Sequence, residues 1–149
     1  MGFALPAAIG AKLARPDKVV VAVEGDGSFL MNNSEIATAV ENNIPFITVL
    51  LNNCGFISIR DLQTKMFGRT FGTEFKKKDG SIGSSDFEKI VGGYGVEYRR
   101  AQTLNEFSHA LKEAINSDAI SVVEAVVERE YPRSGIKEYG SWDLSVPFN

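Results

Sequence analysis

The chain has 149 residues, of which 44% are hydrophobic and 23% charged, the size and composition of one soluble globular domain with a real hydrophobic core. Its net charge of −3 gives no reason to expect a nucleic-acid or anionic-membrane partner, and no apolar run approaches the roughly 20 residues needed to span a bilayer. Cys54 is the only cysteine, so an intrachain disulfide is excluded, and the N-terminus lacks a charged secretory segment. We therefore expect a cytoplasmic protein.

The first part of the chain alternates between helical and strand patterns. Small residues at 4–14, with a proline near the first turn, predict a helix, and the apolar, β-rich run at 18–24 predicts a strand. Asn32 and Glu35 have the spacing of a capping box, which predicts that the next helix begins there. The run 46–51 is apolar on both faces, as expected for a central parallel strand covered by helices on each side.

The pattern is less regular after the second predicted strand. Residues 56–67 predict a short helix, and residues 68–85 are rich in glycine, serine and lysine. A loop of that length is typical of an active-site lid or of a tethered surface segment, and both interpretations stay open. Asp86 is placed to cap a short helix, and residues 96–99 predict a short strand.

The last regular elements determine the fold class that we expect. Thr103 and Glu106 form a second capping box before a helix with one apolar face, and residues 120–127 supply a strong strand. Because strands and helices alternate, we predict an α/β fold with a doubly wound, mostly parallel sheet flanked by helices in three layers. The length predicts a single domain over residues 1–149.

Two polar signals each follow a predicted strand. The Gly25-Asp26-Gly27 turn ends the first strand, and the Asn52-Asn53 pair ends the second. If both strands are parallel, their carboxyl ends bring a carboxylate and an amide oxygen to the same rim of the sheet. Such a pair of hard oxygen ligands suits Mg²⁺, which binds few protein groups and leaves other positions to phosphate oxygens. The glycines would also let the backbone approach an anion closely.

Two common nucleotide-binding motifs do not fit these residues. A dinucleotide fingerprint needs a third glycine at the position of Leu30, and the NTPase loop needs Gly-Lys-Ser/Thr, which the sequence does not contain. Taken alone, the glycine-flanked Asp26 is also compatible with an ordinary turn after a strand. A module that binds or assembles without catalysis is therefore an alternative.

The Met1–Ala11 segment, the Gly25-Asp26-Gly27 turn and the Asn52-Asn53 pair resemble the diphosphate-binding domain of thiamine diphosphate enzymes of the acetolactate synthase superfamily. The resemblance implies thiamine diphosphate and Mg²⁺ as cofactors. It further implies that Asp26, the side chain of Asn53 and the backbone carbonyl of Gly55 ligate the metal. The other implied cofactor contacts are Gly25, Gly27, Ser28 and Phe56, with Met1 as a hydrophobic wedge under the thiazolium ring.

A narrower likeness concerns the reaction. The Asn53–Phe56 segment and residues 71–75 are similar to trihydroxycyclohexane-1,2-dione hydrolase of inositol breakdown, although Arg60 and Asp61 depart from it. The resemblance implies an enzyme that makes or breaks C–C bonds next to a carbonyl of a small molecule. Decarboxylation or carboligation of a 2-oxo acid and hydrolytic cleavage of a cyclic diketone are both compatible with these residues.

The resemblance also implies a partner. Related enzymes activate the cofactor with a glutamate from a separate pyrimidine-binding domain, and 149 residues are too few to include one. We therefore expect a partner domain or subunit that supplies this glutamate, in a homo- or hetero-oligomer. The chain would then be one subunit of a split enzyme, a fragment of a longer polypeptide or a degenerate copy.

Overall fold

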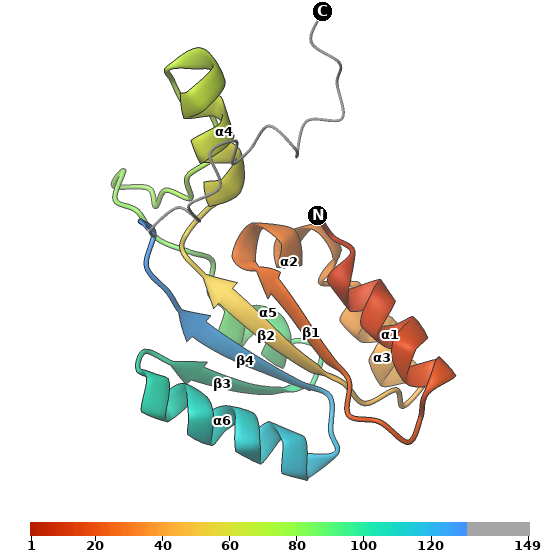
Figure 1. Cartoon of the computed structure of the whole chain (residues 1–149). Helices are drawn as coiled ribbons and strands as arrows, with labels where there is room; N and C mark the ends of the chain where they lie inside the picture. The colour runs from red at the N-terminus through yellow and green to blue at the C-terminus, as the bar shows by residue number, and fades with distance from the viewer. Residues whose placement is uncertain (131–149) are drawn as a thin grey trace, which may run out of the picture.

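The structure, a computed structural model, describes residues 1–130 of the chain. Its strands are β1 (Val21–Gly25), β2 (Ile47–Asn52), β3 (Glu97–Ala101) and β4 (Ser121–Val126). They form a parallel sheet in the order β1-β2-β4-β3 (Figure 1). The central place of β2 between two neighbours confirms what its apolar sequence predicts, because both faces of such a strand are covered.

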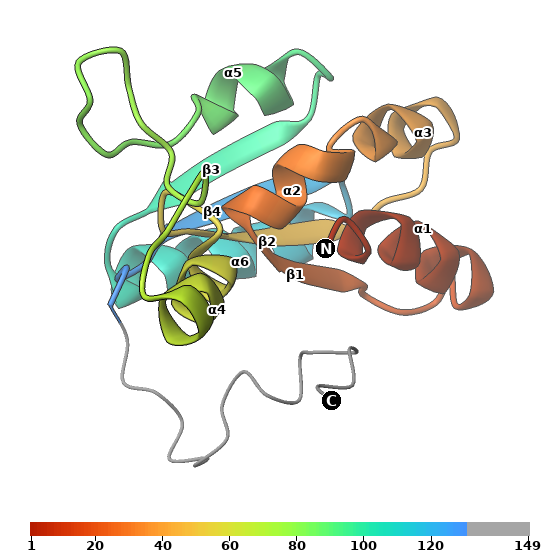
Figure 2. The same ribbon diagram turned by 90° about the horizontal axis from the view of Figure 1, so that it is seen from above.

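Helices cover both faces of the sheet, which gives three layers (Figure 2). The helices are α1 (Ala4–Ala14), α2 (Asp26–Asn32), α3 (Glu35–Glu41), α4 (Ile57–Phe67), α5 (Phe87–Gly92) and α6 (Leu104–Ser117). Helix α6 packs on β3 and β4 from one side, whereas α1 packs on β1 and α5 on β3 from the other. None of the helices in residues 1–130 is long and apolar enough to cross a membrane.

Successive strand residues point into two separate cores. On β4, Val122 belongs to the larger core under α1, α2, α3 and α5, while Val123 belongs to the smaller core under α6. On β2, Leu50 and Ile47 divide between the two cores in the same way. This alternation is what a strand covered on both faces requires, and it confirms the predicted doubly wound α/β class.

One predicted helix start is wrong. Asn32 does not cap the helix that contains Glu35, because residues 26–32 are already helical and Asn32 is the last residue of α2. Its side-chain amide donates to the Gly2 carbonyl at 2.7 Å instead. Helix α3 begins two residues later than predicted, after Ser34, whose side chain makes no capping bond. The first strand also starts later than predicted, at Val21.

The two later caps form as predicted. Asp86 accepts a hydrogen bond from the Lys89 amide at 3.1 Å at the start of α5. Thr103 accepts from the Glu106 amide at 3.2 Å, and the Glu106 carboxylate accepts in return from the Thr103 amide at 3.0 Å. Leu104, the first residue of α6, is 80% exposed, so the buried face of this helix begins further along the chain.

The capping box of α6 yields a stability prediction. Thr103→Ala removes the acceptor for one first-turn amide, and we expect it to lower the free energy of unfolding by about 1 kcal/mol. Ser34→Ala is the matched control, because Ser34 precedes α3 without a capping bond, and its effect should stay within about 0.5 kcal/mol. Urea unfolding followed by circular dichroism measures both values. Equal losses in the two variants would contradict the assignment.

Candidate functional site

A cavity of about 160 Å³ opens at the carboxyl ends of β1 and β2. Its lining includes every residue to which the sequence analysis gave a metal or cofactor role, together with the first turn of α4. These residues are Met1, Gly25, Asp26, Gly27, Ser28, Asn53, Gly55, Phe56, Ile57, Ser58 and Ile59. The structure thus brings the candidate residues together, while their individual roles stay predictions.

Asp26 is completely buried at the start of α2. Its Oδ1 accepts from the Gly27 amide at 2.8 Å and its Oδ2 from the Gly55 amide at 3.0 Å. Burial raises the pKa of Asp26, and the hydrogen bonds from Gly55 and Gly27 oppose that rise. Within residues 1–130 no lysine or arginine forms an ion pair with this carboxylate. A buried carboxylate of this kind is stabilised by a bound cation.

The two asparagines after β2 occupy different environments. Asn52 is buried, and its amide donates to Glu124 Oε1 at 2.6 Å and to Ser84 Oγ at 2.8 Å. Its Oδ1 accepts a hydrogen bond from the Cys54 amide at 3.1 Å. Cys54 itself has a left-handed backbone conformation with a φ of 60°. Asn53 instead lines the cavity. Asn52 therefore shapes the loop from inside, and Asn53 is the member of the pair that is available to a ligand.

Close contacts inside the chain explain two of the glycines. A Cβ atom on Gly27 would lie 2.5 Å from the ring of Phe56, which in turn meets Phe75 edge to face at 5.3 Å. A Cβ atom on Gly55 would lie 2.5 Å from the backbone carbonyl of Thr73. The sequence predicts that Gly27 allows the backbone to approach an anion closely. The structure adds a requirement from the protein's own packing at both positions.

Part of the 68–85 segment pairs with the loop after β2. The Phe56 amide donates to the Thr73 carbonyl at 2.8 Å, and the Phe75 amide donates to the Cys54 carbonyl at 3.1 Å. These bonds form a short antiparallel ladder beside the cavity, centred on the bridge between Gly55 and Glu74. Residues 73–75 are therefore attached to the site, and closure of the rest of the segment as a lid stays a prediction.

Ser28 and Met1 contribute to the lining of the cavity. The Ser28 hydroxyl donates to Glu24 Oε2 at 2.9 Å and accepts from the Gly2 amide at 2.8 Å. The hydrogen bond from Ser28 to Glu24 therefore has to break before the Ser28 hydroxyl can donate to a phosphate oxygen. Met1 is 64% exposed.

The first turn of α4 is the part of the cavity that sequence analysis missed. Ile57, Ser58 and Ile59 contribute to the lining, and the amides of a first helical turn have no partner within their own helix. Such a turn offers N–H groups and a positive dipole end to an anion. The sequence feature that could have indicated this turn is the predicted helix over 56–67, which begins three residues after Asn53.

This chain matches a protein family, several proteins and a solved structure. The family described as thiamine pyrophosphate enzyme, C-terminal TPP binding domain, matches residues 1–125. The 3D-(3,5/4)-trihydroxycyclohexane-1,2-dione hydrolase of Bacillus velezensis is 37% identical over 142 residues, covering 95% of this chain and 22% of the hydrolase. A probable acetolactate synthase large subunit of Methanococcus aeolicus is 37% identical over 131 residues, covering 86% of this chain and 20% of that protein.

A solved structure has the same architecture. The thiamine diphosphate-dependent 4-hydroxybenzoylformate decarboxylase of Rhodococcus jostii RHA1 superposes with a TM-score of 0.77 and 31% sequence identity. The superposition covers 90% of this chain and 24% of the decarboxylase. The chain therefore spans less than a quarter of the length of each of these relatives.

The tight contact at Gly55 yields a second prediction. Gly55→Ala forces a Cβ atom against the backbone carbonyl of Thr73, so we expect the free energy of unfolding to fall by about 1–3 kcal/mol. Hydrogen exchange at the Phe56 amide should accelerate, because that amide donates to the same carbonyl.

The control is a glycine without neighbours. A Cβ atom on Gly10, inside α1, meets nothing within 4 Å, so Gly10→Ala should raise stability by about 0.5–1 kcal/mol. Unchanged exchange at Phe56 in Gly55→Ala would show that the ladder does not depend on a glycine at that position.

Proposed function

The chain belongs to the C-terminal TPP-binding domain family of thiamine pyrophosphate enzymes, and from this premise we propose that it holds the diphosphate end of thiamine diphosphate through Mg²⁺. The observation that carries the proposal is the buried Asp26 carboxylate, which lines one cavity with Asn53 and Gly55. Carboxylate, amide and carbonyl oxygens are the hard ligands that Mg²⁺ accepts. The donor set of this cavity therefore fits the metal.

The family resemblance gives the proposed roles, and the meeting of these groups in one cavity supports them. Asp26, the side chain of Asn53 and the carbonyl of Gly55 hold the metal, and the first-turn amides of α4 face the diphosphate together with Gly27. Phe56 covers Gly27 and closes one side of the cavity. Further cofactor contacts proposed on the basis of the resemblance are Gly25, Ser28 and Met1, the last as the wedge under the thiazolium ring.

Thiamine diphosphate held in this way would supply, at its thiazolium carbon, the chemistry for making or breaking a C–C bond next to a carbonyl. We propose a 2-oxo acid as the substrate class, in a decarboxylation or carboligation. The similarity to a decarboxylase and to a probable acetolactate synthase supports this proposal. Hydrolytic cleavage of a cyclic diketone is a second candidate. It is supported by the 37% identity to the dione hydrolase, which extends over 95% of this chain.

The enzyme that we propose includes more than this domain. The relatives are more than four times as long as the part that this chain covers, because that part is 22% of the hydrolase. We propose that a pyrimidine-binding domain or subunit supplies the activating glutamate and that the assembly is oligomeric. A reducing compartment such as the cytoplasm is the proposed location, supported by the presence of a single cysteine.

Calorimetric titration of thiamine diphosphate into the chain, with and without Mg²⁺, tests the proposal. We expect binding that requires Mg²⁺, and we expect Asp26→Asn to weaken it by more than about 100-fold. Changes in groups that only support metal ligands already cost 10–100-fold in affinity, and Asp26 is proposed as a ligand itself.

Asp86→Asn is the matched control, because asparagine caps a helix as well as aspartate does and the change also removes one negative charge. Its affinity should equal that of the unchanged chain. Binding that is independent of Mg²⁺, or that survives Asp26→Asn, would remove the central assignment.

A further inference from the structure

We propose that Arg129 is a positioning residue that holds the metal loop, residues 53–55, in the conformation that binds Mg²⁺. The inference rests on the proposed function, because it concerns the same cavity. Arg129 lies beyond β4, far from the loop in sequence, and it does not line the cavity. Its effect on a bound metal would therefore be transmitted through the loop backbone.

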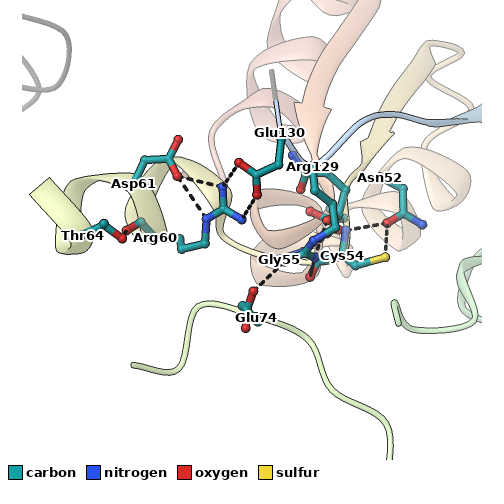
Figure 3. Close-up of polar contacts among 11 residues, drawn as sticks. Asn52, Cys54, Gly55, Arg60, Asp61, Thr64, Glu74, Arg129 and Glu130 are labelled. Carbon is teal, nitrogen blue, oxygen red and sulfur yellow. Dashed lines mark hydrogen bonds and ion pairs between the residues drawn. The ribbon is translucent and has the colours of Figure 1, made fainter. Parts of the chain in front are cut away.

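The guanidinium group of Arg129 joins three chain segments (Figure 3). Its Nη1 donates to the carbonyl of Asn53 at 2.8 Å and to the carbonyl of Cys54 at 2.9 Å. Its Nη2 donates to Glu74 Oε1 at 2.8 Å, in the segment that pairs with the loop. One side chain thus holds both strands of the short ladder beside the cavity.

The two carbonyls are the ones that determine how the loop presents its ligands. Each peptide unit is planar, so a fixed carbonyl at Asn53 and at Cys54 fixes the orientation of both peptide planes around Cys54. Those planes set the direction of the Asn53 side chain on one side and the position of Gly55 on the other. Both residues are proposed metal ligands.

The loop needs such external support because Cys54 has a left-handed backbone with a φ of 60°. That conformation is unfavourable for a residue with a side chain and persists only where the surroundings determine it. Asn52 supplies one support from inside the fold, with its amide held by the buried Glu124. Arg129 supplies the other from the opposite chain segment.

Charge and geometry both favour arginine at this position. A lone cation beside a metal site would repel Mg²⁺, but Glu74 pairs with Arg129 and neutralises it. The planar guanidinium donates to several acceptors in fixed directions, whereas a lysine ammonium acts as a point charge. The next residue, Glu130, pairs with Arg60 of α4 at 2.7 Å, so the segment after β4 also contacts the helix that follows the loop (Figure 3).

The test is a titration of Mg²⁺ into the full chain at a fixed concentration of thiamine diphosphate. We expect Arg129→Gln to raise the half-saturating Mg²⁺ concentration about tenfold, the range found for groups that orient metal ligands. Arg129→Lys should behave like Arg129→Gln, because its ammonium keeps the charge opposite Glu74 but lacks the planar fork that holds the two carbonyls and Glu74 in fixed directions.

Arg99→Gln is the matched control. The Arg99 side chain is 26% exposed, against 25% for Arg129, and it pairs with carboxylates, Glu97 and Glu113, as Arg129 pairs with Glu74. We expect its half-saturating Mg²⁺ concentration to change less than twofold, although its thermal stability also falls. The comparison separates loop positioning from a general loss of ion pairs.

A second measurement needs neither metal nor cofactor. Amide hydrogen exchange at Phe56 and Phe75 should accelerate in Arg129→Gln and remain unchanged in Arg99→Gln. The reason is that Arg129 donates to Cys54 and Glu74 of the ladder, whereas Arg99 pairs with Glu97 and Glu113. Should Arg129→Gln fail to fold, the titration and the exchange rates of Arg129→Lys decide the question.

The outcomes are distinct for the two proposals. If the unchanged chain binds the cofactor with Mg²⁺ and the Arg129 variants match Arg99→Gln, the positioning role is overturned while the proposed function stands. If the unchanged chain shows no Mg²⁺-dependent binding, the proposed function fails and the positioning role fails with it. A tenfold loss confined to the Arg129 variants supports both.

Discussion

The carboxylate of Asp26 joins the ends of two neighbouring strands and lines the cavity beside them. Gly25 pairs with Leu51 in the parallel register of β1 and β2, so Asp26 stands next to the residues that follow β2. Its two oxygens accept from an amide on each side of that junction, Gly27 and Gly55. A shift of one residue in this register would turn Asp26 away, so the cavity depends on the pairing of β1 with β2.

Much of this arrangement could be predicted because it follows from rules that hold for any parallel sheet. Continuous apolar residues in 46–51 required a strand covered on both faces, and strand ends in such a sheet lie on one rim. Asp26 and Asn53 had to converge once both strands were assigned. The caps at Asp86 and Thr103 were equally predictable, because a capping bond joins residues three positions apart.

Contacts between distant segments were not predictable from local patterns. Arg129 reaches Asn53 across 76 positions, and Glu124 reaches Asn52 across 72, with nothing in the local sequence to indicate either pairing. Glu124 also accepts from the hydroxyl of Tyr98, whose pKa is raised by burial and by this carboxylate. The capping box at Asn32 failed for the opposite reason. The spacing of Asn32 and Glu35 matches a capping box, but residues 26–32 are already helical, so Asn32 ends one helix and does not begin the next.

The position of Arg129 has a consequence for where this unit is considered to end. The match to the family description ends at residue 125, within β4, whereas within residues 1–130 the loop after β2 contacts Arg129 and α4 contacts Glu130. Residues that support the loop beside the cavity therefore lie beyond the end of the family match. A polypeptide shortened to residues 1–125 would retain every strand except the last residue of β4, yet the turn beside the cavity would lose one of its two supports.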